Sequence, residues 1–230
     1  MAYRKRKGIS VKLMYGNIAE DYDDCYHSSK IKKTVTAEDI GIKNLVPYEN
    51  QKRILDCGCG TGYFLDIFDV PKTDYLGVDL SSEMLEIARS KHKGYKFHKA
   101  DIMDFQFGFF DLIVSLFSIP DYCGLEIIEK AFDMLEPRGI FACTFINKDG
   151  GYEKIYCLDQ AGYEYEPHVF TYEQIQQAFR RCGYGVVYIC GFSNNKKPNG
   201  LDTESLAQYY LDEQNNLDGC KYYFAMGKKL

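Results

Sequence analysis

The sequence predicts an α/β fold in which helices cover both faces of a mostly parallel sheet. Short apolar runs alternate along the chain with stretches whose apolar residues recur at helical spacing. The runs are short and apolar, as expected of parallel strands that are covered on both faces. With 230 residues, 46% of them hydrophobic, the chain is long enough for one domain with a sizeable core.

Seven segments are expected to be strands, since each is short and rich in apolar residues. They are residues 53–57, 75–80, 95–99, 110–116, 140–145, 186–192 and 221–228. Periodicity does not give the order of these strands in the sheet.

Helical signals lie between the strands, at residues 82–92, 125–135 and 171–182. Thr171 and Gln174 can form a capping box, and Gly183 follows the last turn of the same helix. Pro137 and Gly139 are expected to separate the second helix from the fifth strand. A helix-like run at 201–214 follows a polar loop.

Two amphipathic helices are expected between residues 15 and 45, before the first strand. This stretch is too short for a core of its own, so residues 1–48 are interpreted as a helical cap of the same domain. Residues 49–230 would form the α/β core, with an insertion at about 193–219.

Composition argues against several classes of protein. Apolar runs are far shorter than the about 20 residues needed to cross a bilayer, and no secretory signal is visible. Nine cysteines, an odd number, indicate a reducing, cytoplasmic setting, and their spacing favours no metal site. A net charge of −5 makes nucleic acid a weak candidate partner.

A glycine-rich turn follows the first strand and leads into a helix. Gly58, Gly60 and Gly62 alternate with other residues, and Asp56 comes directly before the turn. Glycine lets a ligand approach the main chain at the carboxyl end of a strand. Dinucleotide-binding turns place two residues before their third glycine, and a carboxylate such as Asp56 is a poor neighbour for phosphate. The turn alone is a weak signal, because it can also simply pack a helix on a strand.

Two more carboxylates follow the next two strands. Asp79 ends the second strand at about the 20-residue interval expected of an acid that binds ribose hydroxyls, and Asp101 follows the third. S-adenosylmethionine has an ammonium and a sulfonium, so it fits such a site: Asp56 would face its amino-acid end, Asp79 the ribose and Asp101 the adenine. Each aspartate by itself could equally be a helix cap or a loop carboxylate.

The chain resembles the class I S-adenosylmethionine-dependent methyltransferases, of the small-molecule type. The resemblance covers most of residues 14–192 and the final strand at 222–225. It rests on the first motif at 55–62, the ribose segment at 77–85, the adenine segment at 100–102, the fourth-strand motif at 110–115 and the turn at 135–139.

The resemblance implies a seven-stranded sheet whose last strand is antiparallel and lies beside the sixth, with the N-terminal helices covering the cofactor. It also implies which residues contact the cofactor. These are Tyr15, Tyr22, Asp56, Gly58, Gly60, Gly62, Asp79, Leu80, Met84, Asp101, Ile102 and Leu116. For Tyr15 and Tyr22 the alternative is packing, since an aromatic pair on an amphipathic helix is more often part of the core.

Candidate catalytic residues follow from where the acceptor would lie in the resembled fold. Asp121 and Tyr122 follow the fourth strand, and His168 lies on a segment that often borders the acceptor pocket. A base near the methyl group would help if a hydroxyl or an ammonium is methylated. Asp121 could instead cap a helix, Tyr122 could pack, and a lone histidine is usually structural.

The expected function is therefore transfer of a methyl group to nitrogen or oxygen of a small-molecule acceptor, by an enzyme that is a monomer or a homodimer. The acceptor itself stays open. Two alternatives belong to other classes: a methyltransferase-like protein that binds the cofactor or a partner without turnover, and an NAD-dependent oxidoreductase. The intact set of Asp56, Asp79 and Asp101 counts against a site that has lost its ligand.

Overall fold

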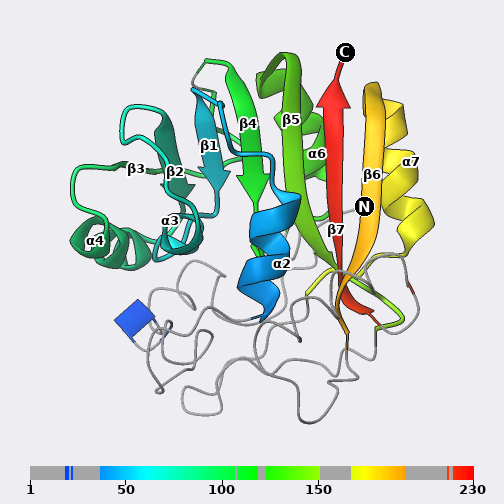
Figure 1. Cartoon of the computed structure of the whole chain (residues 1–230), viewed down its shortest axis with the longest axis horizontal. Coiled ribbons are helices and arrows are strands. Elements are labelled where there is room, and N and C mark those ends of the chain that lie inside the picture. The colour runs from blue at the N-terminus through cyan, green and yellow to red at the C-terminus, as the bar shows by residue number, and fades with distance from the viewer. Residues whose placement is uncertain are drawn as a thin grey trace.

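A seven-stranded sheet, in the order β3-β2-β1-β4-β5-β7-β6, forms the centre of the computed structural model (Figure 1). The structure describes residues 19–20, 22, 37–106, 108–118, 123–150, 167–194, 217 and 220–230. The strands are β1 (Ile54–Cys57), β2 (Tyr75–Asp79), β3 (Lys96–Lys99), β4 (Phe110–Ser115), β5 (Leu135–Ile146), β6 (Tyr184–Asn194) and β7 (Cys220–Lys229).

The direction of the strands confirms the expected topology. β1 pairs in parallel with β2 and β4, β2 with β3, and β4 with β5. The last strand, β7, is antiparallel to both β5 and β6 and lies between them. The carboxyl ends of the five parallel strands therefore share one edge of the sheet, which is the lower edge in Figure 1.

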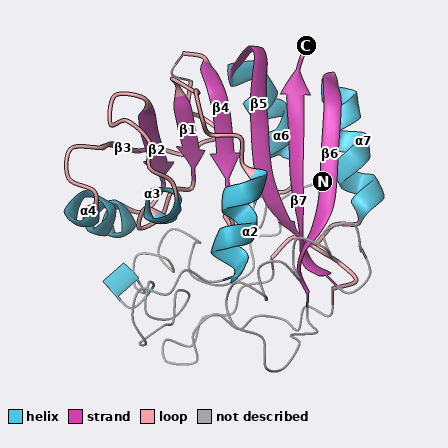
Figure 2. Cartoon of the chain, in the orientation of Figure 1, coloured by secondary structure: helices cyan, strands magenta, loops and turns pink. Residues whose placement is uncertain are grey.

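Helices cover both faces of the sheet, as expected (Figure 2). They are α2 (Ala37–Leu45), α3 (Tyr63–Ile67), α4 (Ser82–Lys91), α6 (Glu126–Met134) and α7 (Tyr172–Cys182). Two of them start at side-chain caps. Ser81 Oγ accepts a hydrogen bond from the Met84 amide at 3.2 Å, and Thr171 and Gln174 form the predicted capping box.

Each face of the sheet has its own hydrophobic core, because successive side chains of a strand point to opposite faces. On one face, Leu55, Ile113 and Phe141 pack with side chains from α6 and α7. On the other, Ile54 and Leu112 pack with side chains from α2 and α3. Covering both faces explains why these strands are almost uniformly apolar.

The expectation that every early strand is covered on both faces is wrong for β3. Lys96, His98 and Lys99 are exposed, and only Phe97 is half-buried. β3 is the edge strand of the sheet, and charged side chains on an edge disfavour pairing with another chain. The predicted strand at 95–99 is therefore present from residue 96, but as a polar edge.

The boundary between the second predicted helix and the fifth strand also differs from the prediction. α6 ends at Met134, and Leu135 already pairs with Phe110, so Pro137 and Gly139 lie within β5. The strand is irregular there, since Arg138 has φ 69° and regular pairing with β4 resumes at Ile140. A Cβ on Gly139 would lie 3.0 Å from the Phe110 carbonyl oxygen, so the position needs a residue without a side chain.

Several expected elements fall outside the described residues, including the run at 201–214 and most of the segment at 15–36. The later part of the expected cap is described as α2, whose Ile42 is fully buried in the same core as α3. The division into a cap at 1–48 and an insertion at 193–219 stays a prediction.

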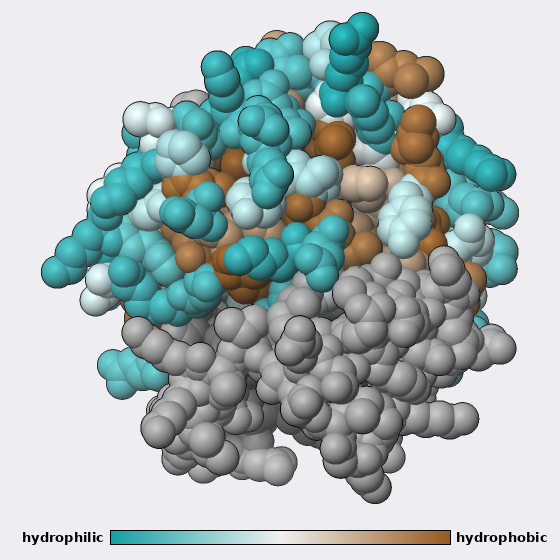
Figure 3. Space-filling view, viewed as in Figure 1, coloured by the Kyte–Doolittle hydropathy of each residue, from teal (hydrophilic) through white to brown (hydrophobic). Residues whose placement is uncertain are grey.

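Polar and charged side chains dominate the described part of the face seen in Figure 3, and hydrophobic side chains lie between them over the middle of the sheet. Within the described residues, no helix combines the length and the apolar character needed to cross a bilayer.

Phe179 of α7 is expected to be a main contributor to the stability of the C-terminal half. Its side chain is fully buried, stacks on Phe141 at a centroid distance of 6.0 Å and lies 4.9 Å from the Tyr184 ring. Phe179→Ala should lower the free energy of unfolding by about 3–5 kcal/mol, measured by urea denaturation. Val186→Ala, at a side chain that is 57% exposed, is the control and should cost less than about 1 kcal/mol. Equal losses would contradict the described core.

Candidate functional site

The glycine-rich turn after β1 is hydrogen-bonded to the end of β2. The amides of Gly58 and Cys59 donate to the Val78 carbonyl at 2.8 and 3.1 Å. Gly58, Gly60 and Gly62 all have positive φ, at 69°, 53° and 98°. These backbone angles are ones that residues with a side chain rarely adopt, so the sequence of the turn is explained by its shape.

Gly62 is also a point of close packing. It is the N-terminal cap of α3, and a Cβ built on it would lie 2.5 Å from His92 Cδ2. His92 Nε2 in turn lies 3.3 Å from Asp66 Oδ1, and Lys91 Nζ lies 2.8 Å from Asp66 Oδ2. Burial raises the pKa of Asp66, but the hydrogen bonds with His92 and Lys91 outweigh it and leave this pKa lowered.

Asp79 joins the end of β2 to the glycine turn. Its Oδ2 accepts a hydrogen bond from the Gly60 amide at 2.9 Å, and its Oδ1 accepts one from the Ser81 amide at 2.8 Å. Burial raises the pKa of Asp79, while its hydrogen bonds from backbone amides lower it and leave a net increase. The carboxylate thus lies directly beside the main chain of the turn.

Asp56 lies inside β1, one residue before its end, and not at the tip that the sequence suggested. The residue is only 3% exposed, and its Oδ2 accepts a hydrogen bond from Tyr75 Oη at 2.7 Å. Burial is the main effect on the pKa of Asp56 and raises it. The hydrogen bond from Tyr75 lowers this pKa, and the nearby charge of Asp79 raises it, so that the net result is a pKa of about 7. A buried aspartate of this kind holds its proton far more readily than an exposed one.

The strand register brings the three aspartates to one edge of the sheet in a stepped row. Asp56 pairs with Gly77, two residues before Asp79, and Asp79 pairs with Lys99, two residues before Asp101. Because side chains alternate along a strand, Asp56 and Asp79 point to the same face. The Ala100 amide donates to the Asp79 carbonyl at 3.0 Å, which holds the segment of Asp101 beside the end of β2.

Asp101 also caps its own loop, because its Oδ1 accepts a hydrogen bond from the Met103 amide at 2.9 Å. Asp79 does the same toward Ser81. The local capping that the sequence allowed as an alternative is therefore present for both residues. The capping hydrogen bond is accepted by Oδ1 in both aspartates. Among the described residues, none donates a hydrogen bond to Oδ2 of Asp101.

The apolar candidates lie around this row. Leu80 is half-buried, while Ile102 is 1% and Leu116 7% exposed. Met84, on α4, is 1% exposed and packs with Ala19 and Tyr22 of the N-terminal segment. The structure thus brings Tyr22 and Met84 together, and their contact with a cofactor stays a prediction.

Of the remaining candidates, Tyr15, Asp121 and Tyr122 lie outside the described residues. His168 is exposed, with its ring 6.2 Å from that of Phe170. The Phe170 amide donates to the Ile146 carbonyl at the end of β5, so His168 lies near the edge that carries the aspartates.

Sequence reasoning missed two features of this region. One is Tyr75, which was interpreted only as a strand residue. The other is Phe117, two residues after the end of β4, which has φ 51° and whose amide donates to Thr144 Oγ1 at 2.6 Å. Its ring lies 5.9 Å from that of Tyr63 and 5.1 Å from that of Tyr222. Non-glycine residues with positive φ are concentrated at functional sites, but no sequence pattern reveals them.

Comparison with known proteins agrees with this geometry. Residues 54–139 match the model of the methyltransferase domain family. A dTDP-3-amino-3,4,6-trideoxy-α-D-glucopyranose N,N-dimethyltransferase of Streptomyces venezuelae is 35% identical over 38% of this chain and 39% of its own length. A demethylmenaquinone methyltransferase of Chlorobaculum parvum is 30% identical over 60% of this chain and 58% of its own.

Similarity in structure extends further along the chain. A SAM-dependent methyltransferase of Thermotoga maritima superposes with a TM-score of 0.67 at 16% identity, over 95% of this chain and 99% of the other. The chain spans between 39% and 58% of the length of the two curated relatives. The fold is thus the Rossmann-like fold of a methyltransferase domain. Residues 54–139 resemble a methyltransferase domain, and the chain as a whole shares its fold with S-adenosylmethionine-dependent methyltransferases.

The glycine turn offers a direct test of its packing. Gly62→Ala should destabilise the protein by about 2 kcal/mol or more, because a side chain at φ 98° is strained and meets His92. Gly60→Ala is the matched control, since a Cβ at Gly60 meets no atom within 4 Å, and should cost about 1 kcal/mol. Urea denaturation measures both.

A double-mutant cycle separates the clash from the backbone strain. In the background of His92→Ala, Gly62→Ala should cost clearly less than in the wild-type protein. An unchanged cost would show that His92 does not crowd Gly62.

Proposed function

We propose that this protein is an enzyme that transfers the methyl group of S-adenosylmethionine to a nitrogen or oxygen of a small-molecule acceptor. The observation that carries the proposal is the stepped row of Asp56, Asp79 and Asp101 beside the glycine turn. The two curated relatives, one named for an amino-sugar nucleotide and one for demethylmenaquinone, support a small acceptor.

The charge and shape of the site fit the cofactor. A row of carboxylates favours a cationic ligand and disfavours a pyrophosphate. A Cβ at Gly60 would meet no atom of the described residues within 4 Å, which supports the approach of a ligand to the main chain of the turn. Asp79, already beside the Gly60 amide, is placed to accept hydrogen bonds from ribose hydroxyls.

The other two aspartates would hold the two ends of the same ligand. Asp56 would face the ammonium, since it is on the same face as Asp79 and next to the turn. Asp101 would accept a hydrogen bond from the adenine amino group, and Ile102 and Leu80 would cover the faces of the ring. Tyr15, Tyr22, Met84 and Leu116 complete the proposed contacts.

In the proposed reaction the bound cofactor supplies a methyl group on a sulfur that is already an activated leaving group. The protein therefore has to align the acceptor and exclude water more than to provide a strong base. Asp121, Tyr122 and His168 stay the candidates to take a proton from the acceptor.

The same proposal includes a cytoplasmic location and a monomeric or homodimeric state. The described cysteines are free thiols, in keeping with a reducing compartment.

Binding of S-adenosylhomocysteine tests the ligand of the site. Calorimetry should give a dissociation constant in the micromolar range, on the order of −8 kcal/mol, and no comparable binding of NAD. Asp79→Ala should weaken this binding by about 1–3 kcal/mol through lost hydrogen bonds. Asp104→Ala, which removes an exposed carboxylate of the loop that begins at Asp101, should leave it unchanged. Binding of NAD alone would refute the proposal.

Turnover needs a separate measurement. Incubation with cofactor labelled in its methyl group and a panel of amines, phenols, sugars and acids should yield a labelled product. Tight binding of the cofactor without product across that panel would favour a protein that binds the cofactor or a partner without catalysis.

A further inference from the structure

Tyr75 is the first residue of β2, and its hydroxyl contacts Asp56 directly. The residue is 2% exposed, and its hydroxyl donates the 2.7 Å hydrogen bond to Asp56 Oδ2. A buried hydroxyl in the first position of a strand does not by itself stabilise a hydrophobic core, since tyrosine brings a polar atom that must find a partner. Here the partner is a carboxylate that faces the proposed cofactor.

The chain keeps space for this hydroxyl at Gly77. A Cβ on Gly77 would lie 2.9 Å from Tyr75 Oη, 2.9 Å from Cys59 Sγ and 2.8 Å from a Phe97 ring carbon. Gly77 has no positive φ, so its backbone angles do not require glycine. The missing side chain instead lets both the Tyr75 hydroxyl and the Cys59 thiol lie close to the Gly77 backbone.

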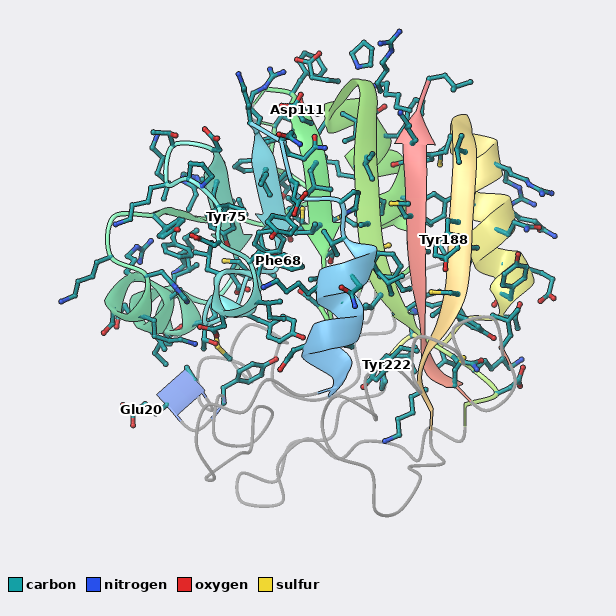
Figure 4. All side chains as sticks on the ribbon, in the orientation of Figure 1. Glu20, Phe68, Tyr75, Asp111, Tyr188 and Tyr222 are labelled. Atoms are coloured by element: carbon teal, nitrogen blue, oxygen red, sulfur yellow. The ribbon has the colours of Figure 1, made fainter. Side chains whose placement is uncertain are left out.

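The Tyr75 ring, which is labelled in Figure 4, is packed against other aromatic rings. Phe64 of α3 stacks on it at a centroid distance of 5.8 Å, and Tyr95 and Phe97 meet it edge-on at 5.7 and 5.9 Å. A hydroxyl on such a ring has one position available, so it acts on Asp56 as a preorganised donor.

We propose that Tyr75 is a positioning residue whose hydroxyl stabilises the ionised form of Asp56 for the cofactor ammonium, so that protons and cofactor compete at Asp56. This inference rests on the proposed function, in which Asp56 faces that ammonium. It extends the proposal to a residue outside the motif and to the pH dependence of binding.

The groups around Asp56 determine the direction of this pH dependence. From β2, Asp79 disfavours its ionised form and the Tyr75 hydroxyl favours it. Burial raises the pKa of the neighbouring Cys57 and Cys59 thiols well above their usual values, so both stay neutral. From β4 the residue paired with Asp56 is Val114, and from α3 the side chain packed on Tyr75 is Phe64.

The pKa of Asp56 in the ligand-free protein, about 7, places the competition in a range where binding can be measured. Below that pH the ligand must displace a proton, so affinity falls about tenfold for each pH unit. Above it Asp56 is ionised and affinity levels off. Without the Tyr75 hydroxyl the pKa rises further, so the midpoint moves to higher pH.

The test measures affinity for S-adenosylhomocysteine by calorimetry between about pH 5.5 and 8.5. Asp56→Asn gives the baseline, since its profile contains only the titration of the ligand and of other groups such as Asp79. Relative to that baseline, the wild-type affinity should rise with pH and then level off, and the midpoint of this transition should lie near pH 7. Tyr75→Phe should move the midpoint upward by about one pH unit or more.

Tyr95→Phe is the matched control. Its ring belongs to the same aromatic group, but its hydroxyl donates to the Val70 carbonyl at 2.8 Å and not to Asp56. This variant should keep the wild-type midpoint. If Tyr75→Phe keeps that midpoint as well, or weakens binding by one factor at every pH, the hydroxyl is merely structural and the inference is wrong.

A second measurement covers the case in which Tyr75→Phe does not fold. Carbon-13 NMR of the wild-type protein, assigned with Asp56→Asn, should show Asp56 titrating near pH 7 without ligand and at lower pH with S-adenosylhomocysteine. A titration near pH 4 in the free protein would overturn the inference. Failure of the wild-type protein to bind S-adenosylhomocysteine at any pH would instead overturn the proposed function.

Discussion

The hydrogen bonds that join the glycine turn to the end of β2 are the constraint on which the rest of the site depends. Gly58 and Cys59 donate to the Val78 carbonyl, and Gly60 donates to the Asp79 carboxylate. These bonds form in a turn whose glycines have positive φ, backbone angles that glycine adopts easily. The pairing of β1 with β2 and of β2 with β3 then places the aspartates in a row along the same edge.

Electrostatics and burial differ along that row, which gives its members different tasks. Asp56 is buried and competes for a proton, Asp79 is held by two backbone amides, and Asp101 caps the next loop. A ligand with a positive end gains from such a site, while a pyrophosphate would meet repulsion from every carboxylate. Burying Asp56 without a cation nearby has a cost in stability, and the Tyr75 hydroxyl offsets part of it.

Much of the fold follows from short-range patterns in the sequence. The helix at 82–92 and the capping box of Thr171 and Gln174 are local, so the structure confirms them almost to the residue. The antiparallel position of β7 was expected only from the resemblance, since periodicity carries no strand order. The polar edge at β3 and the early start of β5 depend on long-range pairing, which local patterns do not contain.

The site shows the same division between local and long-range information. Glycine spacing and the acids after successive strands are visible in the sequence, but the depth of Asp56 within β1 is not. Its partner Tyr75 lies 19 residues away and becomes a neighbour only through the parallel register. The strained backbone of Phe117 likewise depends on Thr144 of the next strand.

A crystal structure of the protein with S-adenosylhomocysteine tests the central claim most directly. The account predicts ribose hydroxyls on the Asp79 carboxylate, the ammonium beside Asp56 and the adenine between Asp101 and the turn. A ligand bound elsewhere, with the three carboxylates still turned only toward their own backbone and Tyr75, would contradict it.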